Sequence, residues 1–177
     1  NMEYHPVINS TNARAMVLGH EGAPEGTLVT ADQQTRGRAR NGGEWPSPSG
    51  RNLYMSVILK PAVSVELLFQ IERAALTALW KAVGQKCSGL PMEMLESGLY
   101  CGGFKIGGIL CEVCGEIGRI HHAVVGIGLN VSHESPESGA SSIQKLTGKT
   151  LSRAELTARV LEEFEFEYRK WLRNERG

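Results

Sequence analysis

The sequence predicts an α+β domain in which helices cover a mostly antiparallel β-sheet. Apolar runs rich in β-forming residues at 53–59, 105–113 and 120–131 indicate strands that pair locally. Apolar residues at helical spacing in 64–86 indicate a long core helix. The 177 residues suffice for one domain with a sizeable core and leave little room for two complete domains. We expect one domain, 1–177.

The N-terminal third predicts two short strands and one helix before a long connection. A strand is expected at 4–8. Ser10-Thr11-Asn12 supplies N-cap side chains for a helix that runs to about residue 18 and ends at Gly19. A second strand at 27–31 leads into the long connection, and the buried strand at 53–59 follows it.

The middle of the chain predicts the long helix and a pair of strands. Lys60-Pro61 breaks the chain before the 64–86 helix, and 92–95 indicates a short strand. The strands at 105–113 and 120–131 flank a glycine-containing turn at 115–118, which predicts an antiparallel hairpin.

The C-terminal segment predicts a loop and two helices. Residues 132–140 are polar and rich in turn formers, as in a surface loop. A short helix is expected at 141–146. Ser152 and Glu155 form a capping box that opens a helix to about residue 174.

The charge balance excludes some classes of partner. Lysine plus arginine equals aspartate plus glutamate at 19 each, so no global field favours nucleic acid or membranes. The sequence has no run of 18 or more apolar residues and does not open with a cleavable signal pattern. We therefore expect a cytoplasmic protein with neither a nucleic-acid nor a membrane partner.

Four cysteines indicate free thiols more than a disulfide framework. Cys111-x-x-Cys114 has His121 and His122 just across the expected turn, which raises the alternative of a metal site. A zinc or redox motif needs a second ligand pair or a helix N-terminus after the first cysteine, and neither is expected here. We therefore expect buried or edge-strand cysteines and no metal ligands.

The long connection between strands carries the strongest functional signal. Arg36, Arg38 and Arg40 alternate with glycine and other small residues, and Trp45 follows them. Guanidinium groups and free backbone amides together bind phosphates well. Long connections inside compact domains are usually functional or disordered. We expect residues 36–50 to form a mobile cationic flap over a nucleotide; the alternative is a solvated charged loop.

The order of residues in this connection resembles the biotin protein ligase family. The matching residues are Gly37-Arg38-Ala39-Arg40, Trp45, Ser47-Pro48 and Gly50-Arg51-Asn52-Leu53-Tyr54. The resemblance continues along nearly the whole chain, at Ile8-Asn9-Ser10-Thr11-Asn12, Glu25-Gly26-Thr27, Lys105-Ile106-Gly107-Gly108-Ile109-Leu110, Gly126-Ile127-Gly128-Leu129-Asn130-Val131 and Ser141-Ser142-Ile143.

The resemblance implies a fold, a reaction and partners. The fold is a class II synthetase-like catalytic domain, a mixed sheet with helices on one side. The N-terminal DNA-binding domain and C-terminal β-barrel of some members are not expected in these 177 residues. The reaction is ATP-dependent formation of biotinyl-5'-AMP and transfer of biotin to a lysine of a biotin carboxyl carrier domain. Biotin, ATP and Mg²⁺ are implied, the Mg²⁺ ligands not being identifiable. Both a monomer and a homodimer paired through sheet edges stay open.

The implied catalytic residues are cations. The biotin carboxylate and the ATP phosphates repel each other, so cations around the reacting oxygens lower the barrier. The resemblance places Arg38 near the carboxylate, Arg40 on the adenylate, and Lys105 between carboxylate and α-phosphate. The alternative for Lys105 is an exposed strand lysine, but the adjacent Gly107-Gly108 permits close backbone approach and favours function.

The remaining implied site residues divide between biotin and nucleotide. The biotin residues are Ser10, Thr11, Gln34, Gly37, Arg38 and Gly108. The nucleotide residues are Arg40, Trp45, Asn52, Lys105 and Asn130. Ser10 and Thr11 also suit simple helix capping. Trp45 also suits a hydrophobic plug.

The sequence departs from the family at residues 94–98. Met94-Leu95-Glu96-Ser97-Gly98 replaces the family's Lys-Trp-Pro-Asn-Asp motif, whose lysine and aspartate are expected to engage phosphates and Mg²⁺. Glu93 or Glu96 could supply a carboxylate in a shifted register. Gly43 also replaces a loop arginine. A biotin- or adenylate-binding protein with weak or absent catalysis is therefore an alternative, and a lipoate or octanoate ligase and a nucleic-acid binder are lesser ones.

Overall fold

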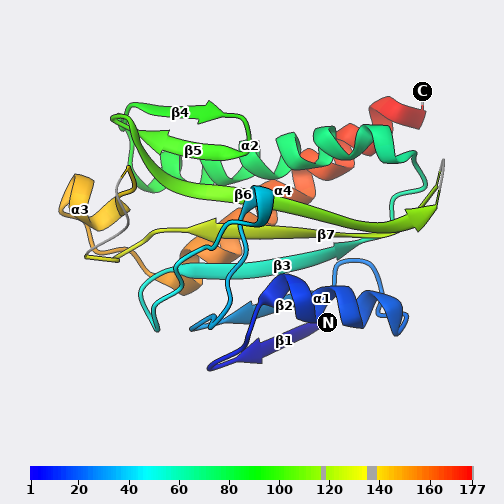
Figure 1. Cartoon of the computed structure of the whole chain (residues 1–177). Coiled ribbons are helices and arrows are strands. Elements are labelled where there is room, and N and C mark those ends of the chain that lie inside the picture. The colour runs from blue at the N-terminus through cyan, green and yellow to red at the C-terminus, as the bar shows by residue number, and fades with distance from the viewer. Residues whose placement is uncertain (117–118, 135–138, 177) are drawn as a thin grey trace.

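The computed structural model describes residues 1–116, 119–134 and 139–176, and it contains a seven-stranded sheet with helices on both faces (Figure 1). The strands are β1 (Met2–His5), β2 (Leu28–Ala31), β3 (Leu53–Leu59), β4 (Met92–Leu95), β5 (Gly98–Cys101), β6 (Phe104–Glu116) and β7 (Arg119–Leu129). The α-helices are α1 (Thr11–His20), α2 (Leu68–Lys86), α3 (Ile143–Thr147) and α4 (Arg153–Arg176), with 3-10 turns η1 (Arg40–Gly42) and η2 (Val65–Leu67).

The strand order is β1-β2-β3-β7-β6-β5-β4. The β1–β2 pair is parallel, and every other pair is antiparallel. This arrangement confirms the expected α+β class with a mixed, mostly antiparallel sheet. β3 and β7 lie at its centre, and every residue of β3 is buried. This burial explains why the sequence shows there a continuous apolar run without alternation.

The two faces of the sheet are covered differently. On one face Met55, Val57 and Leu59 of β3 join the main core beneath α2 and α4. On the other face Ile58 packs with Ala15 of α1 in a smaller cluster. The expectation that helices lie on one side is therefore wrong for α1. Because successive strand residues point to opposite faces, the α1 face receives a separate set of side chains.

Several predicted boundaries are confirmed and one is wrong. The buried strand matches 53–59, and α4 opens with the expected cap, in which the Glu155 amide donates to Ser152 Oγ at 3.3 Å. α1 is capped by Ser10 as predicted, although it continues through Gly19 to His20. The first strand is Met2–His5 instead of 4–8; Ile8 makes only an isolated bridge to Gln34.

β5 was not expected from the sequence. It has four residues between the turn at 96–97 and the Gly102-Gly103 turn, which is too short for a periodic signal. The expected turn at 115–118 falls partly on 117–118, and the expected loop at 132–140 partly on 135–138, outside the described residues. Within the described ranges, no helix has the length and apolar character needed to cross a membrane.

Candidate functional site

The site lies on the α1 face, where residues 36–50 cross in front of the sheet (Figure 1). A cavity here is enclosed by the start of α1, the loop, and β3, β6 and β7. Its lining includes the predicted residues Ser10, Thr11, Gln34, Arg38, Arg40, Trp45, Lys105 and Gly108. Segments from distant parts of the sequence thus bring most of the predicted site residues together.

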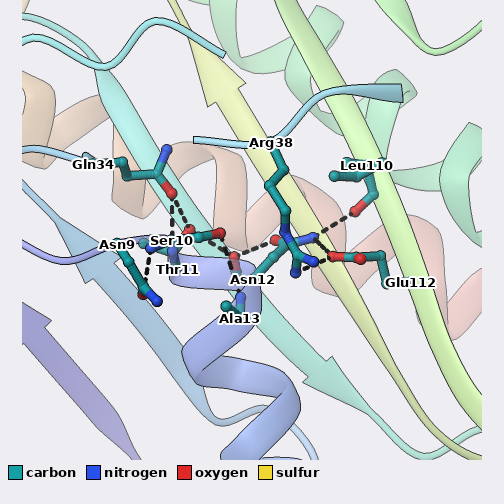
Figure 2. A network of polar contacts seen from close by, with 10 residues as sticks. Asn9, Ser10, Thr11, Asn12, Ala13, Gln34, Arg38, Leu110 and Glu112 are labelled. Atoms are coloured by element: carbon teal, nitrogen blue, oxygen red, sulfur yellow. Dashed lines mark hydrogen bonds and ion pairs between the residues drawn. The ribbon is translucent and has the colours of Figure 1, made fainter. Parts of the chain in front are cut away.

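A chain of hydrogen bonds holds the start of α1 to the sheet and to the loop (Figure 2). The Thr11 amide and hydroxyl both donate to Gln34 Oε1, at 2.9 and 3.1 Å. Ser56 Oγ donates to Asn12 Oδ1 at 2.5 Å. Asn12 Nδ2 donates to Glu112 Oε2 at 2.8 Å. These mutually supporting contacts fix the polar wall of the cavity before any ligand arrives.

The strand glycines let this wall approach the sheet closely. A Cβ at Gly126 would lie 2.1 Å from Asn12 Oδ1, and one at Gly128 would lie 2.7 Å from the Trp45 ring. No side chain fits at either position without moving its neighbour. Gly37 is buried in the same way, since its Cβ would lie 2.3 Å from the Trp45 carbonyl oxygen. Gly37 does not line the cavity. Its missing side chain lets the backbone at residue 45 pack directly against the backbone at residue 37.

Trp45 separates the first cavity from a second one. Its ring lies against Gly128 and near Gly108, and Lys105 Nζ is 5.5 Å from the ring centroid. Such a distance permits a cation–π contact. The indole Nε1 is buried and has no hydrogen-bond partner among the described residues. Trp45 and Lys105 line both cavities and thus form their boundary.

The two predicted asparagines have different positions. Asn130 lines the second cavity, together with Tyr100 and His133. Asn52 is fully buried and lines neither cavity; its Nδ2 donates to Asn130 Oδ1 at 3.2 Å, and its Oδ1 accepts from the Val131 amide at 3.1 Å. Asn52 therefore orients Asn130, and the expectation that it contacts the nucleotide itself receives no support from its position.

Two carboxylates hold the loop arginines. Arg38 Nη2 is 2.7 Å from Glu112 Oε2, and Arg40 Nη2 is 2.6 Å from Glu72 Oε2. Both arginine side chains are more than two-fifths exposed. Burial raises the pKa of Glu72, and the nearby Arg40 charge opposes that rise.

Lys105 has no carboxylate within 4.0 Å among the described residues. Burial lowers its pKa first, the Arg40 charge lowers it further, and the Glu96 charge acts in the opposite direction. A half-buried ammonium group without a close carboxylate is suited to bind an anionic ligand. Much of its hydration is already lost in the folded protein, so ligand binding does not have to remove it.

The divergent 94–98 block forms the tight hairpin that joins β4 to β5. Leu95 pairs with Gly98, so Glu96 and Ser97 make a two-residue turn, and Glu96 has a positive φ of 50°. The Ser97 carbonyl accepts from the Ile109 amide at 2.8 Å, and Ser97 lines the first cavity. Glu96 is therefore the one carboxylate within residues 94–98, and its charge raises the pKa of Lys105.

Several cavity residues were not identified as site residues from the sequence. Asn12, Gly126 and Gly128 line the cavity, and Ser56 and Glu112 support it from outside the lining through their hydrogen bonds to Asn12. The glycines repeat at a spacing of two on one strand, which places both on one face and was a readable signal. Glu112 is an acidic residue inside an otherwise apolar strand, which also marks a partnered charge. Nothing in the local sequence distinguishes Ser56.

Comparison with known proteins places this geometry in a family. Residues 4–130 match the model of the biotin/lipoate A/B protein ligase family. The bifunctional ligase/repressor BirA of Bacillus subtilis is 32% identical over 96% of the chain and 54% of its own length. A biotin–[acetyl-CoA-carboxylase] ligase of Paracoccus denitrificans is 34% identical over 75% of the chain and 55% of its own length. The chain thus spans about half the length of these relatives.

The structural likeness covers nearly the whole chain. The biotin protein ligase from Aquifex aeolicus, solved in complex with biotin and ATP, superposes with a TM-score of 0.83 at 26% identity. The match covers 98% of this chain and 72% of that one. Sequence and structure agree, and the chain belongs to the biotin/lipoate A/B protein ligase family, with the fold of a biotin protein ligase catalytic domain.

Proposed function

We propose that the protein is an ATP-dependent biotin protein ligase, which forms biotinyl-5'-AMP and transfers biotin to a lysine of a biotin carboxyl carrier domain. The observation that carries this proposal is the division of the site into two cavities that meet at Lys105 and Trp45. A reaction between two anions needs two binding places that share a cation at their junction.

The first cavity suits biotin. The ureido ring has two N–H donors and one carbonyl acceptor, and Ser10, Thr11 and Gln34 line only this cavity. Gly108 and Gly128 also line this cavity, and their lack of side chains lets the Trp45 ring lie flat against the sheet at its edge. Arg38 would hold the carboxylate end of biotin after leaving Glu112.

The second cavity suits the nucleotide. Asn130 and the Trp45 ring line it, and Arg40 lies on the loop that borders it. Lys105 would neutralise both the biotin carboxylate and the α-phosphate, so that a carboxylate oxygen can attack the phosphorus and release pyrophosphate. The carrier lysine amine then attacks the acyl carbon, and AMP leaves. ATP would bring Mg²⁺, and Glu44 is the acidic residue among the described residues that line this cavity, whereas Glu96 acts on Lys105 from outside it.

The test is pyrophosphate release from ATP with biotin, followed by biotin transfer to a carboxyl carrier domain. The proposal requires release that depends on biotin and exceeds that with lipoate or octanoate. Release with octanoate but not biotin would assign the protein to the lipoate branch instead.

A second candidate function is binding of biotin or its adenylate without turnover. The observation in its favour is the hairpin at 94–98, which offers no lysine and only one carboxylate. This candidate predicts biotin binding by isothermal titration with no pyrophosphate release. Restoring Lys-Trp-Pro-Asn-Asp at 94–98 should then create release, whereas brisk release by the unaltered protein would exclude it.

A further inference from the structure

Three side chains that could bind a metal meet at the other end of the α1 face. His20 is the last residue of α1, Cys114 lies on β6, and His122 lies on β7. One ligand atom of each lies within 4.8 Å of those of the other two. Cys114 Sγ is 4.0 Å from His20 Nδ1, and the two imidazole rings are perpendicular with centroids 5.0 Å apart.

The pairing of strands explains which members of the sequence motif take part. Cys114 and His122 are register partners in the β6–β7 ladder and so point to the same face. Cys111, three residues earlier on the strand, points to the opposite face and packs against the main core. His121 points away from His122 and lies 3.7 Å from Glu116. The Cys-x-x-Cys spacing therefore does not form the cluster; each pair contributes one member.

His122 provides an independent indication of a ligand. It is 3% exposed, yet its Nε2 has no hydrogen-bond partner in the described ranges of the chain. A buried polar atom without a partner is costly and calls for an explanation. A metal ion would supply such a partner, since a neutral imidazole nitrogen is the commonest metal ligand in proteins.

Gly19 leaves room for the ring, since a Cβ there would lie 2.4 Å from His122 Cδ2. The fold thus places the buried His122 ring next to the Cys114 thiol and the His20 imidazole.

We propose that His20, Cys114 and His122 bind Zn²⁺. One sulfur and two nitrogen ligands are a set that zinc prefers, and three protein ligands leave one position for water. Ligand atoms around a tetrahedral zinc lie about 3.5 Å apart. A rotation of the exposed His20 side chain at the helix end would close the cluster to that spacing. The bound ion would fasten the end of α1 to the β6–β7 ladder, independently of the proposed ligase function.

The test uses Co²⁺ as a spectroscopic substitute for zinc, with the reduced full chain. We expect one Co²⁺ per chain, a near-ultraviolet thiolate-to-cobalt absorption band, and displacement of the cobalt by Zn²⁺. Cys114→Ser should abolish the band. His20→Ala should weaken affinity more than about tenfold, since even residues that only orient a ligand contribute about 10- to 100-fold. Both positions are accessible enough to change without unfolding, which circular dichroism checks.

The matched controls are Cys111→Ser and His121→Ala, the other halves of each sequence pair. Both should keep the band and the affinity of the unaltered protein. Zn²⁺ should also raise the melting temperature of the unaltered protein but not that of Cys114→Ser. Absence of a stoichiometric band, its persistence in Cys114→Ser, or its loss in Cys111→Ser would each overturn the proposal.

Discussion

The two walls of the cavity differ in how they are built. The wall formed by α1 and the arginine loop is joined by hydrogen bonds from Gln34 through Thr11, Ser56 and Asn12 to Glu112. The wall at 94–98 is a two-residue turn that contributes Ser97 to the cavity lining, while Glu96, the one carboxylate of this block, is exposed. In the proposed function, recognition of the acid and activation by ATP would therefore rest on separate parts of the fold, so that one can weaken while the other stays intact.

The largest expected effect separates the two walls at their junction. Lys105→Ala should lower biotin-dependent pyrophosphate release by about 10²- to 10³-fold, as loss of one charge-stabilising group does in other enzymes. Biotin affinity without ATP, measured by isothermal titration, should fall much less than the rate, because the polar wall for the ureido ring is untouched and only one charge near the carboxylate is lost. Lys105→Arg should recover part of the rate. Equal losses in affinity and rate would show that the walls do not act separately.

A smaller effect is expected at the loop. Arg40→Ala should speed dissociation of biotinyl-adenylate by about tenfold or more, since a hydrogen bond to a charged group contributes about 1.5–3 kcal/mol. Stopped-flow dissociation measures the rate. Arg36→Ala is the matched control, because Arg36 is exposed on the same loop and lies outside the cavity lining. An unchanged dissociation rate in Arg40→Ala would show that Arg40 does not help to retain biotinyl-adenylate.

The hairpin is expected to contribute less. Burial and Arg40 lower the pKa of Lys105, and Glu96 opposes them. Activation needs protonated Lys105, so it should fall as pH rises through that lowered pKa. Glu96→Gln removes the opposing charge, so the fall should move to lower pH, with a loss of about two- to fivefold at a fixed alkaline pH, typical of an exposed charge pair. Glu93→Gln should leave the profile unchanged. A far larger loss would make the hairpin an essential wall.

The smallest effect concerns the carboxylate that competes for the loop. Glu72→Gln should release Arg40 toward the adenylate and slow its dissociation by about twofold, because partly exposed ion pairs contribute less than about 1 kcal/mol. The same stopped-flow experiment measures it. Faster dissociation would instead mean that Glu72 positions Arg40 for the nucleotide.

The parts of the fold set by local pattern were predictable. The buried strand at 53–59, the cap at Ser10 and the Ser152 half of the capping box each follow from residues close in sequence, while the Glu155 carboxylate binds Lys86 instead. The face of the sheet on which α1 packs was not predictable, because the short apolar surface of this helix could pack on either face. β5 was missed because four residues carry no period.

The site shows the same division. Arg38, Arg40 and Lys105 could be found because they stand in an ordered motif, and the structure places them around one cavity. The carboxylates that hold the two arginines could not be assigned, because Glu72 and Glu112 lie 32 and 74 residues away in the sequence. Asn52 was given a ligand role from its place in the motif, although its amide is used within the protein. A sequence motif therefore identifies the residues of a site, whereas the tertiary contacts show whether each one faces the cavity or supports a neighbour.

The position of Trp45 makes its intrinsic fluorescence a reporter of ligand binding at the site. Of the three tryptophans, Trp80 lies on α2 and Trp171 on α4, while Trp45 alone borders the two cavities. Its indole N–H is buried and finds no acceptor in the part of the chain that the structure describes. A ligand that offers an acceptor, or that displaces the ring, therefore changes the environment of this fluorophore. Tryptophan emission should therefore follow occupancy of the site in real time, without any label.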